Sequence, residues 1–307
     1  MSIPIVIDCD PGHDDAIAIL LALSSPEVEL RGITTVAGNQ TLDKTTRNAL
    51  KVLELADRTD IPVAAGADRP LHRPLRTAAN VHGESGLDGP DLPEPRTKAV
   101  GTPAVDLLAE LIEPGVVLVP TGPLTNVALL LERHPGVRDR LERIVWMGGA
   151  IAEGNVTPAA EFNAFVDPEA AAAVFASGIP VTMIGLDVTH MALFDSGHAE
   201  RLRGAGRAGK AVAELADFFL EFHRLRYRFD GAPIHDAMAV AHVIDPTLVT
   251  TLECNIAIET ASEHCDGRTV VDRWNVLADA PRNAHAGIDV DANRFLELLV
   301  ERISSLP

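Results

Sequence analysis

Residues 3–23 read IPIVIDCDPGHDDAIAILLAL, and this stretch decides the fold. The apolar, β-branched run over 3–9 predicts a strand that is buried on both faces, and the Ala-, Ile- and Leu-rich run over 14–24 predicts a helix. Acidic side chains are poor strand residues, and they repel one another when they are partly buried. Yet four of them stand here: Asp8, Asp10, Asp14 and Asp15. The stretch is therefore either a solvated loop with accidental charges or a site for something positively charged.

Strands and helices alternate along the rest of the chain. Further strands are predicted at 28–38, 61–66, 116–122, 143–149 and 179–187, and further helices at 41–56, 103–112, 124–133, 208–229 and 235–244. Segments 254–260 and 268–272 predict a small β appendage. The alternation predicts an α/β fold, with one domain over 1–307 and an open, mainly parallel sheet flanked by helices. The Pro- and Gly-rich segment 67–102 is too long for a simple connector, so we expect it to be functional or mobile.

Composition excludes several classes of protein. The net charge of −18 argues against a nucleic-acid partner, because phosphate binding needs basic patches. The longest apolar run, 16–23, is too short to span a bilayer, so no membrane partner is expected. The three cysteines form no CxxC pair, which suggests neither disulfides nor zinc and favours a reducing compartment. With no basic leader before the first strand, we expect a cytoplasmic protein.

The aspartates fall where the first strand ends and the first helix begins, and ligands of open α/β sheets bind beyond the carboxyl ends of strands. A helix N-terminus favours acidic side chains, which could explain Asp14 and Asp15 but not Asp8 and Asp10. Oxygen ligands suit Ca²⁺ or Mg²⁺, and no nearby His or Cys pattern favours zinc. The cluster therefore predicts a site for a hard cation, which would offset the carboxylate repulsion and lower the pKa of a coordinated water.

Residues at other strand ends are candidates for the same pocket. Asn39 follows the second predicted strand, Thr121 the fourth and Met147 the fifth, while His235 and Asp236 open a later helix. Each signal is weak alone, because a Gly-rich turn is often only a turn and an Asn is often only a cap. Their agreement on one edge of the sheet predicts a single site.

The chain carries an ordered set of motifs: DCDPGHDDAIAIL, VAGN, PTGPLTN, MGGAI, GNVTPAAEFNAFVDPEAA, GLDVTH and HDA. This set resembles the inosine-uridine-preferring nucleoside hydrolase family over nearly the whole chain. The resemblance implies that family's Rossmann-like fold and hydrolysis of the N-glycosidic bond of ribonucleosides to free base and ribose. It also implies a tightly held Ca²⁺ and a homo-oligomer, either a tetramer or a dimer.

Residue roles follow from the matching motifs. The resemblance implies metal ligation by Asp10, Asp15, Asp236 and the main-chain carbonyl of Thr121, with Asp10 also acting as the general base that activates a Ca²⁺-bound water. The implied substrate contacts are Asp14, Asn163 and Asn39 at the ribose 2′ and 3′ hydroxyls, Asn155 and Glu161 at the 5′ hydroxyl, and Met147 against the ribose. Glycosidic cleavage passes through an oxocarbenium-like state, which a carboxylate-lined pocket stabilises.

The leaving base needs its own residues. His235 is predicted to assist the departure of the base. The alternative is that it is a buried histidine at the start of a helix, with a structural role only. The spacing between Tyr227 and His235 resembles that in pyrimidine-preferring members of the family. This resemblance implies that Tyr227 relays a proton together with His235. The alternative is that Tyr227 only packs the end of the long helix. His82, in NVHGESGLDG, is expected on a mobile lid over sugar and base. His223 could reach the pocket but is expected on a solvated face.

The leading prediction is thus a Ca²⁺-dependent ribonucleoside hydrolase that leans towards pyrimidine substrates such as uridine and cytidine. A broader purine-plus-pyrimidine preference is the nearest variant. A strand ending in DxD would also suit a Mg²⁺ phosphohydrolase, but no basic phosphate cradle is evident. A nucleoside-binding protein without activity is the remaining alternative, and the presence of Asp10 argues against it.

Overall fold

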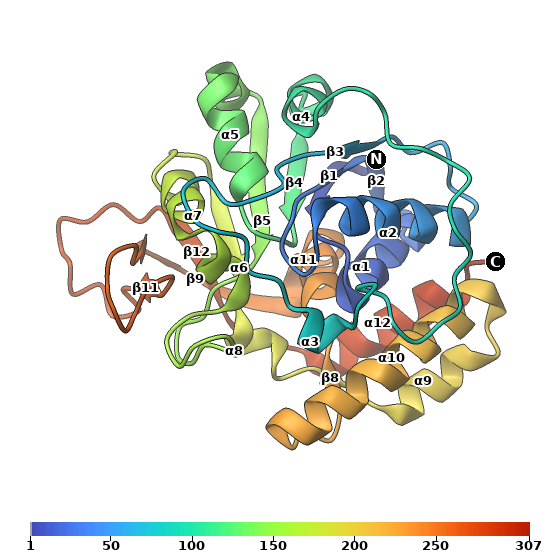
Figure 1. The fold of residues 1–307 in the computed structure, drawn as a ribbon. Helices are drawn as coiled ribbons and strands as arrows, with labels where there is room; N and C mark the ends of the chain where they lie inside the picture. The colour runs from blue at the N-terminus through green and yellow to red at the C-terminus, as the bar shows by residue number, and fades with distance from the viewer. Residues whose placement is uncertain (1) are drawn as a thin grey trace.

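The computed structural model describes residues 2–307 (Figure 1). Its central sheet has eight strands in the order β3-β2-β1-β4-β5-β6-β12-β9. Neighbouring strands run parallel, except that β9 is antiparallel to β12 at one edge. The strands are β1 (Ile3–Cys9), β2 (Val28–Thr35), β3 (Val63–Ala65), β4 (Val116–Pro120), β5 (Leu141–Met147), β6 (Val181–Ile184), β9 (Val249–Cys254) and β12 (Ala284–Val290). The predicted open, mainly parallel sheet is confirmed.

Helices cover both faces of this sheet (Figure 1). Successive side chains of a strand point to opposite faces, so Ile5 and Ile7 enter one apolar layer and Val6 enters the other. The first layer is completed by α1 (His13–Ser24), α2 (Leu42–Leu55), α9 (Ser196–Arg203), α10 (Gly206–Tyr227), α11 (His235–Ile244) and α12 (Ala292–Ser304). The second layer is completed by α4 (Ala104–Leu111), α5 (Thr125–Arg133) and α7 (Pro168–Phe175).

The remaining elements are short. They are the helices α3 (Ala79–His82), α6 (Phe162–Val166) and α8 (Leu186–Thr189), and the 3₁₀ turns η1 (Pro135–Asp139) and η2 (Pro246–Leu248). Two small antiparallel sheets pair β7 (Leu193–Phe194) with β8 (Ala232–Pro233), and β10 (Ile256–Ile258) with β11 (Thr269–Val271). The second pair confirms the predicted β appendage. Within residues 2–307, no helix is both long and apolar enough to cross a membrane.

The strand order reverses beside β1. The chain passes from β1 to β2 and β3 on one side, and then returns to place β4, β5 and β6 on the other side. The carboxyl ends of β1 and β4 therefore adjoin at a topological switch point, where open α/β sheets bind their ligands. The backbone N–H of Thr121, just after β4, donates to the main-chain oxygen of Asp8 over 2.8 Å. This contact brings the loops that follow the two strands together.

Candidate active site

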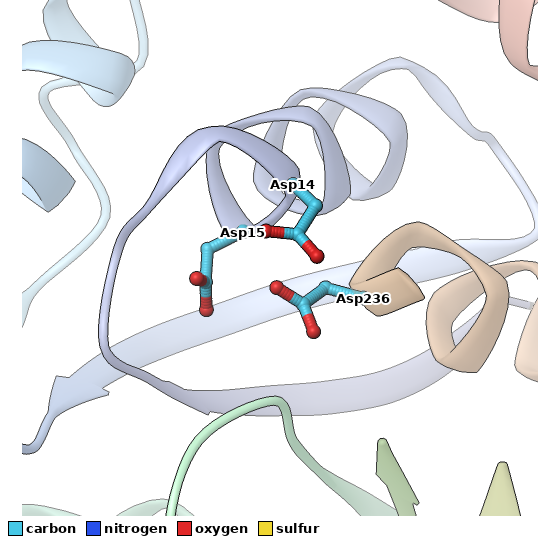
Figure 2. Close-up of side chains that lie close together, drawn as sticks. All are labelled: Asp14, Asp15 and Asp236. Atoms are coloured by element: carbon cyan, nitrogen blue, oxygen red, sulfur yellow. The ribbon is translucent and has the colours of Figure 1, made fainter. Parts of the chain in front are cut away.

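Carboxylates from two helices meet at this switch point. Helix α1 places Asp14 and Asp15 in its first turn, and α11 places Asp236 in its own first turn. One carboxylate oxygen of each residue lies within 4.8 Å of the other two (Figure 2). Burial raises the pKa of all three side chains, to about 8 for Asp14, where the charge of Asp15 raises it further. Such a group of oxygen donors is what a hard divalent cation prefers.

Asp10 lies in the same region, although it is not part of that closest set. Its Oδ2 accepts a hydrogen bond from the backbone N–H of Asn39 over 2.6 Å, while its buried Oδ1 has no partner among residues 2–307. Burial and then the charge of Asp15 raise the pKa of Asp10 well above its usual value. Gly122 makes room for this carboxylate, because a Cβ there would lie 2.6 Å from Oδ1. An unpaired buried oxygen near further carboxylates fits a cation ligand.

Neighbouring polar groups hold Asp15 in place. Its Oδ2 accepts from the backbone N–H of Gly12 over 2.9 Å and from Nδ2 of Asn39 over 3.2 Å. Its Oδ1 accepts from the hydroxyl of Thr121 over 2.8 Å. The main-chain oxygen of Thr121 in turn accepts from Nδ2 of Asn163 over 2.9 Å. The predicted residues at the ends of β2 and β4 therefore do converge on the carboxylates.

A cavity of about 460 Å³ adjoins the cluster and gathers most of the predicted site. Asp10 and Asp15 are fully buried and do not line it. The predicted residues in its wall are Asp14, Asn39, His82, Thr121, Met147, Asn155, Glu161, Asn163, Tyr227, His235 and Asp236. These residues are distant in sequence, and the fold brings them to one place.

One end of the cavity is built around the N-terminus of α6. Glu161 caps this helix, and its carboxylate accepts from the backbone N–H groups of Gly149, Asn163 and Ala164 over 2.8, 2.9 and 3.2 Å. Burial raises the pKa of Glu161 to about 7. Asn155 accepts from the first backbone N–H of α6 over 2.9 Å. This end therefore offers polar groups suited to hydroxyls.

Rings from α10 and α11, and that of His190 directly after α8, form another part of the wall. The hydroxyl of Thr189 lies 2.7 Å from Nδ1 of His235, and the ring centroids of His190 and His235 are 5.5 Å apart. Tyr227 stacks on His223 with 5.7 Å between centroids. Burial lowers the pKa of His223 to about 4 and that of His235 well below its usual value, so both rings are neutral at pH 7. A flat, neutral wall of this kind suits a planar heterocycle.

The structure places two further histidines in the wall of the cavity. His223 is not on a solvated face: its Nδ1 donates to the main-chain oxygen of Phe219 over 2.9 Å, and the buried ring lines the cavity. That prediction was wrong. His82 is also buried, at the end of α3, and its loop is held to α2 because Nδ2 of Asn48 donates to the main-chain oxygen of Ser85 over 2.9 Å.

Sequence reasoning missed several residues of the site. His190 and Arg226 line the cavity, and His13 supports it from behind by contacting His82. His13 stands within the aspartate motif and His190 within GLDVTH. The presence of a histidine inside each of these two motifs was the signal that could have identified both residues.

Comparisons with known proteins identify the family of the chain. Residues 5–297 match the family model described as inosine-uridine preferring nucleoside hydrolase. A curated relative from Enterobacter sp. (strain 638), named pyrimidine-specific ribonucleoside hydrolase RihA, is 52% identical over 310 residues, covering 99% of this chain and 98% of its own. The relative of the same name from Escherichia coli O7:K1 (strain IAI39 / ExPEC) is 53% identical over 309 residues, covering 99% of each chain.

Solved structures give the same result. The plant nucleoside hydrolase PpNRh1 superposes with a TM-score of 0.93 at 33% identity, over 99% of this chain and 100% of its own. The purine-preferring ribonucleoside hydrolase from Gardnerella vaginalis superposes with a TM-score of 0.92 at 36% identity, over 98% of each chain. The likeness seen in the motifs is thereby confirmed, and the chain belongs to the inosine-uridine preferring nucleoside hydrolase family.

Proposed function

We propose that this N-glycosyl hydrolase cleaves ribonucleosides to free base and ribose, with a preference for pyrimidine nucleosides such as uridine and cytidine. The observation that carries the proposal is one cavity that joins a buried carboxylate cluster to a wall of neutral rings. The two RihA relatives support the pyrimidine preference, at 52% and 53% identity. A broader preference is the alternative, supported by the purine-preferring structural neighbour at 36% identity.

The bound cation is proposed to be Ca²⁺, held by Asp10, Asp15, Asp236 and the carbonyl oxygen of Thr121. An all-oxygen donor set and the unpaired Oδ1 of Asp10 support this choice. When bound, such a cation offsets the carboxylate repulsion and lowers the pKa of a coordinated water. Asp14 is a further candidate ligand, because its oxygen belongs to the closest set.

The protein groups would carry out proton transfer and positioning. The carboxylate of Asp10, oriented by the backbone N–H of Asn39, would accept the proton of the attacking water. Positive charge develops on the sugar during cleavage, and the buried carboxylates stabilise it. The proposed ribose contacts are Asp14, Asn39 and Asn163 at the 2′ and 3′ hydroxyls, Asn155 and Glu161 at the 5′ hydroxyl, and Met147 against the ring. These hydrogen bonds position the ring, so substrates without the 2′ hydroxyl should be poor.

The leaving base would be assisted by His235. The hydroxyl of Thr189 would donate to Nδ1, so that the neutral ring carries its hydrogen on Nε2 and can donate it to the base. Burial keeps the ring neutral, and Tyr227, which also lines the cavity, is the proposed proton relay. His82 would contact the substrate from the opposite loop.

The setting of the enzyme is also proposed. One domain over 1–307 is supported by a sheet that takes strands from both halves of the chain. The free cysteines Cys9, Cys254 and Cys265 support a cytoplasmic location. A homo-oligomer, dimer or tetramer, is supported by a group of exposed apolar side chains after β11, of which Trp274 is 81% exposed and Val276 76%.

The test is release of free ribose from uridine, cytidine, inosine, adenosine and 2′-deoxyuridine. Wild type and Asp10→Asn are compared, and the metal content of both proteins is measured. We expect Asp10→Asn to lose about a thousandfold in kcat while it keeps the metal. Asp8→Asn is the matched control, because Asp8 is equally buried but bonded to Thr34 and Asn126. Metal-loaded wild type that releases no ribose from any substrate would overturn the proposal.

A further inference from the structure

His13 touches a cavity residue without lining the cavity itself. It is fully buried, and its ring Nδ1 lies 3.1 Å from Nδ1 of His82. The backbone N–H of His13 approaches the same atom of His82 over 3.3 Å. On the other side of its ring, Nε2 lies 2.7 Å from the main-chain oxygen of Asp88. His13 therefore bridges the start of α1 to two points of the loop that carries His82.

The hydrogens of this bridge follow from the partner atoms. A carbonyl oxygen can only accept, so Nε2 of His13 carries a hydrogen and donates it to Asp88. A neutral imidazole carries a single hydrogen, so Nδ1 of His13 is the acceptor and Nδ1 of His82, 3.1 Å away, is the donor. Nδ1 of His82 is thus committed to His13. Nε2 is the ring nitrogen of His82 that remains for a molecule in the cavity.

Packing fixes the same arrangement. The ring of His13 is nearly parallel to that of Phe219, with 5.4 Å between centroids and 4° between planes. The ring of His82 stacks on the same Phe219 with 5.6 Å between centroids. Gly12 leaves the space that His82 needs, because a Cβ there would lie 2.5 Å from its Nδ1. Hydrogen bonds and ring contacts together therefore leave His82 little freedom to rotate.

We propose that His13 is a positioning residue for the reaction: it holds the imidazole of His82 so that Nε2 faces the substrate cavity. The inference rests on the proposed function, since it concerns a residue assigned to substrate contact there. His13 acts on the substrate only through His82. The segment that carries Asp14 and Asp15 therefore also fixes the orientation of His82, which is contributed by the loop after β3.

Two isosteric changes separate the two bonds of His13. The amide of His13→Asn reaches the place of Nδ1, so it can keep the bond to His82 and loses the one to Asp88. The amide of His13→Gln reaches the place of Nε2, so it keeps Asp88 and loses His82. We expect kcat for the best ribonucleoside to fall roughly tenfold in His13→Gln and roughly twofold in His13→Asn. In a protein that already carries His82→Ala, adding His13→Gln should lower kcat by a further factor of less than about two.

Nitrogen-15 spectra of the imidazoles give a readout that does not depend on turnover. In wild type, a through-hydrogen-bond coupling should join the Nδ1 atoms of His13 and His82. In His13→Gln, the Nδ1 resonance of His82 should move away from its wild-type position. Both results support the inference even if wild type hydrolyses none of the nucleosides, which would be a failure of the proposed function alone.

Three results would overturn the inference. The first is a wild-type spectrum without the coupling, which requires no variant to fold. The second is an equal loss of kcat in His13→Gln and His13→Asn, and the third is a full additional loss on the His82→Ala background. Metal content and thermal midpoint, measured for each variant, identify any loss that comes from misfolding.

Discussion

The hydroxyl of Thr189 lies 2.7 Å from Nδ1 of His235; both side chains are buried, and His235 lines the cavity. This bond fixes the orientation of the ring and leaves Nε2 to assist the base. Thr189→Val keeps the shape of the side chain and removes the hydroxyl. We expect kcat for uridine to fall about tenfold, because the ring loses its orientation.

A riboside with a p-nitrophenol leaving group distinguishes this role from a general distortion. That leaving group departs as a stable anion and needs no proton from the protein. Its kcat should be almost unchanged in Thr189→Val, and measuring kcat for both substrates in both proteins checks this. Equal losses for uridine and the p-nitrophenyl riboside would mean that Thr189 does not act through the leaving group.

A methyl group at Gly122 should disturb the cation site. A Cβ there would lie 2.6 Å from Oδ1 of Asp10, too close for the carboxylate to stay where it is. We expect Gly122→Ala to lose at least about tenfold in Ca²⁺ affinity, measured by calorimetry. Gly101→Ala is the matched control, since a Cβ at Gly101 meets nothing within 4 Å. Equal Ca²⁺ affinity in Gly122→Ala and wild type would remove Asp10 from the proposed ligands.

The sequence predicted the switch-point site because its residues stand at strand ends, and the carboxyl ends of parallel strands share one edge. It could not say which carboxylates are closest, since Asp14 and Asp236 meet only through the packing of α1 against α11. His223 was misplaced for a simpler reason. It lies four residues before Tyr227 on α10, and residues four apart share a helix face, so a pocket role for one implied the same face for the other.

The strands that the sequence did not predict, β9 and β12, lie together at one end of the sheet. Strand β12 reads AHAGIDV, with a glycine and two charged or polar positions, and β9 reads VTTLEC with little apolar alternation. Neither segment has a strong strand pattern of its own. Their pairing with each other and with β6 supplies the hydrogen bonds that local sequence does not predict.

Removing the cation should destabilise the protein, and more so at higher pH. At a free Ca²⁺ concentration of about 100 times Kd, binding adds roughly 2.7 kcal/mol to the free energy of unfolding. Without cation, the pKa of Asp14 is raised to about 8, so protons compete with Ca²⁺ below that pH. We expect the thermal midpoint to rise more on adding Ca²⁺ at about pH 8.5 than at about pH 6.5. The same rise at both pH values would contradict this coupling.

Glu161 should give the fold a pH dependence of its own. Burial raises its pKa from 4.5 to about 7, so the folded protein holds this proton more tightly than the unfolded chain does. The stability that the protonated group contributes is complete below about pH 4.5, and it is lost as the pH rises through about 7. Glu161→Gln has no such proton to lose.

The difference between the two proteins isolates this effect, because the buried histidines titrate alike in both. Between about pH 5 and about pH 8, the free energy of unfolding of metal-free wild type should fall relative to Glu161→Gln by on the order of 3 kcal/mol. Urea unfolding of both proteins across this range measures the difference. Parallel curves would show that the carboxyl of Glu161 is ionised throughout, and that the backbone N–H groups at the start of α6 outweigh its burial.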